Sequence, residues 1–224
     1  MLDLVKSYEF FKPEKCRDTI HIIGCGSVGA TIAENLSRFG LTKIVLYDFD
    51  VVESRNIANQ IFLQKHIGVP KTQALLEMLC EINPELRETV KIESEGYTGQ
   101  PLSGYIFLAV DNIDLRREIV AANKDNVFIK AVFDVRTGLT SAQHYAAAWN
   151  DSKMVQDLLN SMAFTHEEAV AETPMSACGA TLSVCPTVRC ICALAVANFT
   201  NYVNGCKLKK FMVLDAFSFT LDAF

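Results

Sequence analysis

The chain has 224 residues and a formal net charge of −5 at pH 7, and its 50% hydrophobic and 21% charged content is typical of soluble globular proteins. No apolar run approaches the roughly 20 residues that span a bilayer, and the N-terminus lacks the basic and then apolar pattern of a signal peptide, so we expect a cytoplasmic protein that does not bind membranes. The basic residues form no stripe that could follow nucleic-acid phosphates, which excludes nucleic acid as an obvious partner. The 8 cysteines are too few and too irregularly spaced for a disulfide scaffold, so we expect reduced thiols.

The first part of the chain predicts a strand, a helix and a second strand. Residues 19–26, TIHIIGCG, are apolar and β-branched and end in glycine, and residues 27–40 place apolar side chains at helical spacing. Residues 43–50, KIVLYDFD, form a second apolar run that ends in carboxylates. This order predicts a right-handed βαβ unit.

Alternating patterns continue to about residue 135. After a polar loop at 51–66, the sequence predicts helices at 68–83 and 114–123 and strands at 90–97, 104–112 and 126–135. Strands that alternate with helices predict an α/β fold with a doubly wound, Rossmann-like, mostly parallel sheet and helices on both faces.

The pattern changes after residue 136. We expect a strand antiparallel to the sheet at 137–149, an amphipathic helix at 151–162, an aperiodic loop over the sheet at 165–180, an apolar buried or interface helix at 186–203 and edge strands at 209–224.

A glycine-rich turn is the first functional signal. Gly24, Gly26 and Gly29, with Ser27 among them, follow a predicted strand and open a predicted helix. Without Cβ atoms such a turn can pass close to a phosphate, whose charge sits at the positive helix terminus. Asp48 ends the second strand, where a carboxylate can bind both hydroxyls of a ribose in either NAD or ATP. The alternatives are glycines needed only for packing and a solvated Asp48.

Four later segments help to decide whether the bound nucleotide is NAD or ATP. They are D-F-D-V-V at 48–52, N-I-A-N-Q at 56–60, G-V-P-K at 68–71 and D-N at 111–112. Together with the glycine turn, and in this order, they resemble the ThiF/MoeB superfamily of adenylating domains related to ubiquitin-activating enzymes. The resemblance spans roughly residues 15–135 and is weak beyond them.

The resemblance implies ATP-dependent adenylation of a carboxylate, usually the C-terminal glycine of a ubiquitin-like or sulfur-carrier protein, by a homodimer. Attack of a carboxylate on the α-phosphate brings two anions together, so the site needs fixed positive charge and a metal more than a base. Lys71 can neutralise phosphate oxygens and Asp111 can hold Mg²⁺. Taken alone, Lys71 would be a solvated helix-start lysine and Asp111 a turn residue.

The remaining predicted roles follow from the same resemblance. Lys71, Asp111 and Gln60 are the predicted catalytic residues, and nucleotide contacts beyond the glycine turn are expected from Asp48, Asp50, Asn56, Asn59 and Asn112. We expect one domain over residues 1–224, with a nucleotide-binding half at 1–135. Residues 136–224 would supply a crossover loop, substrate-side strands and a dimer-forming helix.

The sequence departs from the family pattern at Asn59, where related proteins carry an arginine that contacts the triphosphate. That change removes a permanent cation. Three explanations are open: Arg55 reaches into the site, a second subunit supplies a basic residue such as Lys6, Lys15 or Arg17, or the protein binds ATP without efficient turnover.

Cysteines give two further expectations. The C-x-x-C pairs that bind structural zinc in many family members are missing, and Cys190 and Cys192 would point about 200° apart on a helix, so we expect no structural zinc. Cys178 follows the aperiodic loop, in the region where related proteins often carry an active cysteine, and is a candidate nucleophile or a small packed residue.

Two other functions remain open at this point. One is a nucleotide-binding scaffold of the same fold that has lost catalysis, and the other is an NAD-dependent oxidoreductase.

Overall fold

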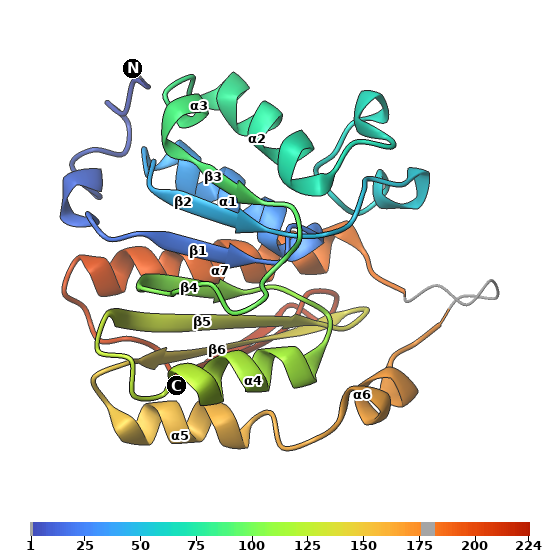
Figure 1. Ribbon diagram of the computed structural model, residues 1–224. Coiled ribbons are helices and arrows are strands. Elements are labelled where there is room, and N and C mark those ends of the chain that lie inside the picture. The colour runs from blue at the N-terminus through green and yellow to red at the C-terminus, as the bar shows by residue number, and fades with distance from the viewer. Residues whose placement is uncertain (1, 176–181) are drawn as a thin grey trace.

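The computed structural model of the protein describes residues 2–175 and 182–224. Eight strands form one sheet in the order β3-β2-β1-β4-β5-β6-β7-β8 (Figure 1). The strands are β1 (Ile20–Ile23), β2 (Ile44–Tyr47), β3 (Lys91–Glu93), β4 (Gly104–Leu108), β5 (Ile129–Thr137), β6 (Ser141–Ala148), β7 (Phe211–Asp215) and β8 (Thr220–Ala223). The strands from β3 to β5 in this order pair in parallel, and β6, β7 and β8 add antiparallel pairs. The predicted α/β fold is confirmed.

Helices cover both faces of the sheet, as expected for a doubly wound fold. They are α1 (Ser27–Arg38), α2 (Lys71–Ile82), α3 (Leu86–Thr89), α4 (Ile113–Asn123), α5 (Ser152–Asn160), α6 (His166–Glu172) and α7 (Cys185–Val203). Figure 1 shows α1 and α7 behind the sheet and α4 in front of it. Helix α7 packs against α1, β5 and β6, while α5 packs against β6 and α4.

Strand β1 lies at the centre of the parallel part, between β2 and β4. Ile23, its last residue, is in register with Tyr47 of β2 and with Leu108 of β4. The carboxyl ends of the three strands therefore meet at one edge, where the chain order reverses. In open α/β sheets this switch point is where ligands bind.

The prediction for residues 165–180 is wrong in its first half. Residues His166–Glu172 form α6, which begins with a capping box: the Thr165 side chain accepts from the Glu168 backbone N–H, and the Glu168 carboxylate accepts from the Thr165 N–H. Seven residues are too few to show helical periodicity, so the cap was the only available signal. Residues 176–181 lie outside the described residues.

Short helices in predicted loops were also missed. Residues Ser54–Asn56 and Gln64–His66 form two 3₁₀ turns, η2 and η3, inside the expected polar loop, and α3 follows α2. A further 3₁₀ turn, η1 (Pro13–Lys15), precedes β1. Such one-turn elements leave no sequence period.

Helix α7 packs against the sheet of its own chain. This burial accounts for most of the apolar residues in the helix. Cys192 is fully buried and Cys190 is exposed, so the two thiols lie on opposite sides of the helix. The outward positions carry small or polar residues: Pro186, Cys190, Ala193, Ala197 and Asn201. Within the part of the chain that the structure describes, none of the helices has the length and apolarity that crossing a membrane requires.

Candidate functional site

The glycine-rich turn joins β1 to α1, and its three glycines meet different demands. Gly24 has φ +96°, and a Cβ there would lie 2.7 Å from the carbonyl carbon of Ala109. A Cβ on Gly29 would lie 1.8 Å from the Gly24 carbonyl oxygen. Packing therefore explains these two glycines. A Cβ on Gly26 would meet nothing within 4 Å, so the turn is open to a ligand at Gly26.

Helix α1 starts at this opening without a side-chain cap. Gly26 is its N-cap residue and Ser27 its first residue, and in the described part of the chain no side chain accepts from the N–H groups of the first turn. The first N–H groups of a helix lack partners within the helix and form its positive end. An uncapped terminus of a 12-residue helix at a sheet switch point can bind an anion such as a phosphate.

Asp48 ties the glycine turn to the end of β2. Its Oδ2 accepts from the Cys25 backbone N–H at 2.7 Å, and its Oδ1 accepts from the Asp50 N–H at 2.8 Å. Burial raises the pKa of the Asp48 carboxyl, and the nearby Lys71 ammonium opposes that rise. The carboxylate lies beside the turn as predicted, with a lone pair still available on each oxygen.

Lys71 begins α2 and faces the same turn. Its Nζ donates to Asp50 Oδ2 at 2.6 Å, and Asp50 in turn donates its N–H to Asp48, the residue that accepts from the Cys25 N–H. The Lys71 charge opposes the rise that burial causes in the pKa of Asp48 and of Cys25. The backbone holds this arrangement: Lys71 N–H donates to the Asp50 carbonyl, and Val52 pairs with Val69. Residues 50–52 and 68–71 thus close the intervening loop at its base.

The loop at 56–60 contains a buried side-chain oxygen, Gln60 Oε1. Among the residues that the structure describes it has no hydrogen-bond donor, so a ligand donor could bind it. Asn56 Oδ1 accepts instead from the Glu53 N–H at 2.8 Å and caps η2. Asn59 is half-buried, and the exposed Arg55 pairs with Glu53 rather than with any residue of the glycine turn.

The turn after β4 carries the predicted metal ligand. Asp111 is exposed, and its carboxylate has no partner among the described residues. Asn112 Oδ1 accepts from the Leu115 N–H and caps α4. No group of three or more candidate metal ligands occurs in residues 2–175 and 182–224. One free carboxylate suits Mg²⁺, which proteins usually hold through one or two carboxylates, water and substrate phosphates.

A buried arginine that sequence reasoning missed fixes the turn before Asp111. Arg116 donates through Nε and Nη2 to the Val110 carbonyl and through Nη1 to the Val135 carbonyl, and it pairs with Asp134. Asp134 is fully buried and also pairs with Arg136. A signal existed, because Arg116 occupies the apolar stripe of α4 together with Ile113, Ile119 and Val120.

The next residue of α4, Arg117, fixes the chain that leads to α6. Arg117 donates from Nη1 to the Met162 and Phe164 carbonyls, and it pairs with Asp114. Asp114 Oδ2 accepts from the His166 N–H at 3.2 Å. The segment that leads toward residues 176–181 is therefore anchored to the helix that follows Asp111.

Lys15 and Arg17, the cations that a second subunit could supply, lie away from the glycine turn of their own subunit. Lys15 donates to Asn204 Oδ1 and Arg17 to the Glu14 carbonyl, and both residues precede β1, at the opposite end of that strand from the glycine turn. Cys178 lies outside the described residues. Cys25 is buried within the turn, and burial raises the pKa of its thiol, which makes it a poor nucleophile.

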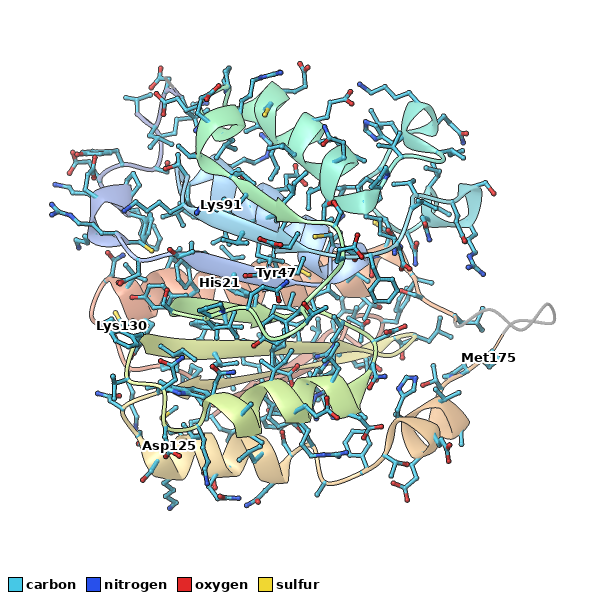
Figure 2. The ribbon with its side chains drawn as sticks, viewed as in Figure 1. His21, Tyr47, Lys91, Asp125, Lys130 and Met175 are labelled. Atoms are coloured by element: carbon cyan, nitrogen blue, oxygen red, sulfur yellow. The ribbon has the colours of Figure 1, made fainter. Side chains whose placement is uncertain are left out.

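A buried pair lies beneath the site, between β1 and β2 (Figure 2). His21 Nδ1 and Tyr47 Oη are 2.8 Å apart, and His21 Nε2 accepts from the Ser103 N–H at 3.4 Å. Burial lowers the pKa of His21 to about 4, so its ring is neutral at pH 7. The pair fixes the residue that precedes Asp48.

Curated relatives match parts of the chain. It is 30% identical over 146 residues to ubiquitin-like modifier-activating enzyme 5 of Drosophila virilis, covering 56% of this chain and 34% of that protein. It is 39% identical over 74 residues to the Arabidopsis thaliana protein of the same name, covering 33% of this chain and 17% of that protein. The chain thus spans about a third or less of the length of these two relatives.

Solved structures share the fold over most of the chain. A crystal structure of E. coli MccB with ATP superposes with a TM-score of 0.72 at 15% identity, covering 95% of this chain and 65% of that one. A structure of PaaA superposes with a TM-score of 0.69 at 18% identity, covering 95% and 74%. The profile of the ThiF family matches residues 14–224. The chain belongs to the ThiF family.

Proposed function

We propose that the chain is an adenylating enzyme that uses ATP and Mg²⁺ to activate the C-terminal carboxylate of a small ubiquitin-like or sulfur-carrier-type protein. One observation carries the proposal: a series of hydrogen bonds links a buried lysine to the turn before an uncapped helix terminus. Lys71 Nζ donates to Asp50, the Asp50 N–H to Asp48, and the Cys25 N–H to Asp48, while Gly26 leaves the start of α1 open.

The proposed reaction is a nucleotidyl transfer. A carboxylate oxygen of the partner forms a bond to the α-phosphorus of ATP, the bond from that phosphorus to the bridging oxygen breaks, and pyrophosphate leaves with its electron pair. Lys71 and the N-terminus of α1 would stabilise the phosphate charge, and Asp111 would hold Mg²⁺, which supplies further positive charge when bound.

The remaining polar groups have proposed nucleotide contacts. Asp48 would accept from the ribose hydroxyls, and a hydroxyl would donate to the unpartnered Gln60 Oε1. Asp50, Asn56, Asn59 and Asn112 remain candidates for contacts to sugar or phosphate, although Asp50, Asn56 and Asn112 already hold protein groups through one oxygen.

The printed names of the similar proteins support this proposal. The curated relatives are named as enzymes that activate a ubiquitin-like modifier, and the MccB structures are described with ATP in one case and with MccA in another. A nicotinamide oxidoreductase has no such support.

The antiparallel strands offer a surface for the protein partner. The Arg136 guanidinium lies 4.4 Å from the centre of the Tyr145 ring, Tyr145 lies 4.7 Å from Phe211, and Phe211 lies 6.2 Å from Phe224. These side chains run across β5, β6 and β7 and are half-buried or exposed. A row of aromatic rings beside arginine is typical of protein interfaces.

A homodimer is part of the proposal because Asn59 stands where related proteins carry an arginine, so the site of one subunit lacks that cation. Arg55 pairs with Glu53, and Lys15 and Arg17 are held at the far edge of their own subunit, so a second subunit would have to supply any further cation. Light scattering on the purified chain tests this directly: a dimer mass is expected.

Exchange of labelled pyrophosphate into ATP tests the reaction, with and without a small protein that ends in glycine. We expect exchange only when this partner is present, and a fall of about 100-fold or more for Lys71→Met and Asp111→Asn, since each removes charge stabilisation of the transition state. Lys65→Met is the matched control, because Lys65 is an exposed lysine in η3, just before α2, and pairs with Glu77.

One result would overturn the proposed activity, and another would overturn the proposed role of Lys71. ATP binding without exchange for every glycine-ended partner would favour the nucleotide-binding scaffold, for which the loss of the arginine at Asn59 is the supporting observation. Equal exchange by the Lys71 and Lys65 variants would remove Lys71 from the reaction.

A further inference from the structure

A cavity lies at the opposite end of the helices that form the candidate site. It has a volume of about 750 Å³ and lies between the N-terminal residues 2–14 and the C-terminal ends of α1 and α2. Both helices have 12 residues and span about 18 Å from the glycine turn side to this cavity. The volume falls in the range of ligand-binding pockets.

The cavity attracts positive charge. Four carboxylates line it, and none of its lining residues is a lysine or an arginine: the acids are Asp3, Glu9, Glu14 and Glu85. No ion pair is recorded for these four side chains in the described part of the chain. Gly40 follows the end of α1, and Asn83 is the C-cap of α2, so the negative ends of two helix dipoles also face the cavity.

An amide in the wall can donate a hydrogen bond to an occupant of the cavity. Asn83 is 1% exposed, and its Oδ1 accepts from the Glu85 N–H at 3.2 Å. Its Nδ2 has no acceptor among the described residues, although Asn83 lines the cavity. An occupant that presents a carbonyl or a similar acceptor can take the place of water on this donor.

The rest of the wall is apolar. Leu4 packs on Gly40, where a Cβ would lie 2.6 Å from Leu4 Cδ1, and Pro13 lies next to it. Tyr8 completes this side, with its hydroxyl 3.5 Å from Glu14 Oε1. An aliphatic stem or side chain fits this surface, as do the methylene groups of lysine and arginine.

We propose that this cavity binds a peptide segment of a partner protein that carries an arginine or lysine next to an aliphatic residue. The guanidinium or ammonium would meet the carboxylates, a backbone carbonyl would accept from Asn83 Nδ2, and the aliphatic side chain would cover Leu4 and Pro13. A polyamine supplies the charge but has no acceptor for the amide, so the wall favours a peptide. The inference stands independently of the adenylation chemistry.

The test is titration of the full chain with the peptide N-acetyl-Leu-Arg-Leu-amide, followed by ¹H–¹⁵N NMR. We expect saturable shifts at the Tyr8, Gly40 and Thr42 amides and at the Asn83 side-chain amide, with a Kd below about 1 mM. The triple variant Glu9→Gln, Glu14→Gln, Glu85→Gln should bind at least about tenfold more weakly. The matched control is the triple variant Glu95→Gln, Glu118→Gln, Asp125→Asn, which removes the same charge at exposed positions elsewhere.

Two further probes separate the sources of binding. A peptide with citrulline in place of arginine keeps the shape and loses the charge, and it should bind at least about tenfold more weakly to the unmodified chain. Spermine should not shift the Asn83 side-chain amide. The proposal is overturned if the peptide shifts other amides or does not saturate. It is also overturned if the citrulline peptide binds as tightly as the arginine peptide, or if the two triple variants bind the arginine peptide equally well. Spermine binding that shifts the Asn83 side-chain amide as strongly as the peptide does would overturn it too.

Discussion

The Lys71 ammonium lies 2.6 Å from the Asp50 carboxylate, and the lysine is the buried partner of this pair. The Lys71 side chain is 9% exposed and that of Asp50 is 53% exposed. Asp50 thus neutralises the Lys71 ammonium, which is largely removed from water. Lys71 neutralises the Asp50 carboxylate, which water can solvate. The two halves of the pair should therefore have different effects on stability.

Asp50→Ala is expected to destabilise the protein more than Lys71→Met. Removing Asp50 leaves a buried ammonium without its partner, at a cost of about 1–3 kcal/mol. Lys71→Met keeps the apolar stem and leaves only an exposed carboxylate unpaired, at a cost below about 1 kcal/mol. Urea unfolding measures both free energies. A larger loss for Lys71→Met would contradict the assignment of the lysine as the member that needs the pair.

The glycines of the turn should separate into two classes. Gly29→Ala should destabilise the fold by several kcal/mol, because its Cβ would lie 1.8 Å from the Gly24 oxygen and the backbone would have to move. Gly26→Ala should change the free energy of unfolding by about 1 kcal/mol or less and should weaken nucleotide binding, since its Cβ projects into the open space. Thermal melts with and without ATP measure both. Unchanged ATP stabilisation of Gly26→Ala would mean that no phosphate approaches this position.

Arg116 should be a major contributor to stability although it is charged. Arg116→Ala leaves Asp134 fully buried with Arg136 as its remaining ion-pair partner and frees the Val110 carbonyl, so we expect a loss of about 3–5 kcal/mol. The comparison is Arg55→Ala, which breaks an exposed pair and should cost below about 1 kcal/mol. Chemical denaturation of the two variants decides the matter, and similar losses would contradict this account of the turn before Asp111.

The protein should lose stability as the pH falls from about 6.5 to about 4. Burial lowers the pKa of His21 and of His144 from 6.5 to about 4 in the folded state, so the unfolded chain binds protons in this range and the folded chain does not. Asp48, whose pKa is raised by burial, acts in the opposite direction above pH 3.8 and offsets part of the loss.

His144 shows why protonation is unfavourable. Its Nδ1 lies 3.2 Å from the Asp134 carbonyl, and Nε2 faces the Asn198 amide at 3.1 Å, where a proton would oppose another donor. An NMR titration of the 4 histidines should show two that stay neutral at pH 5. Titration of all four near pH 6.5 would contradict the prediction.

The sequence was sufficient for the sheet because its signals are local and strong. Apolar runs such as 104–108 and 44–47 are central strands buried on both faces, and glycine at 24, 26 and 29 marks the first turn. Helix α6 was not predicted because a helix this short is identified by its capping residues rather than by a periodic apolar pattern.

The site was only partly predictable for a different reason. Motif spacing indicated Lys71 and Asp48, but it could not show that Lys71 pairs with Asp50 or that Asn56 caps η2. Those facts depend on the path of the loop between 52 and 68, which has no periodic signal. The buried charges of Arg116 and Asp134 depend on contacts between elements that are distant in sequence.

A crystal structure with Mg²⁺ and a non-hydrolysable ATP analogue would show where the nucleotide binds. We expect the triphosphate at Gly26 and the start of α1, with Lys71 Nζ on a phosphate oxygen and the Asp111 carboxylate on the metal. A nucleotide bound elsewhere, or one bound here while Lys71 stays on Asp50 and Asp111 stays out of contact, would contradict this expectation.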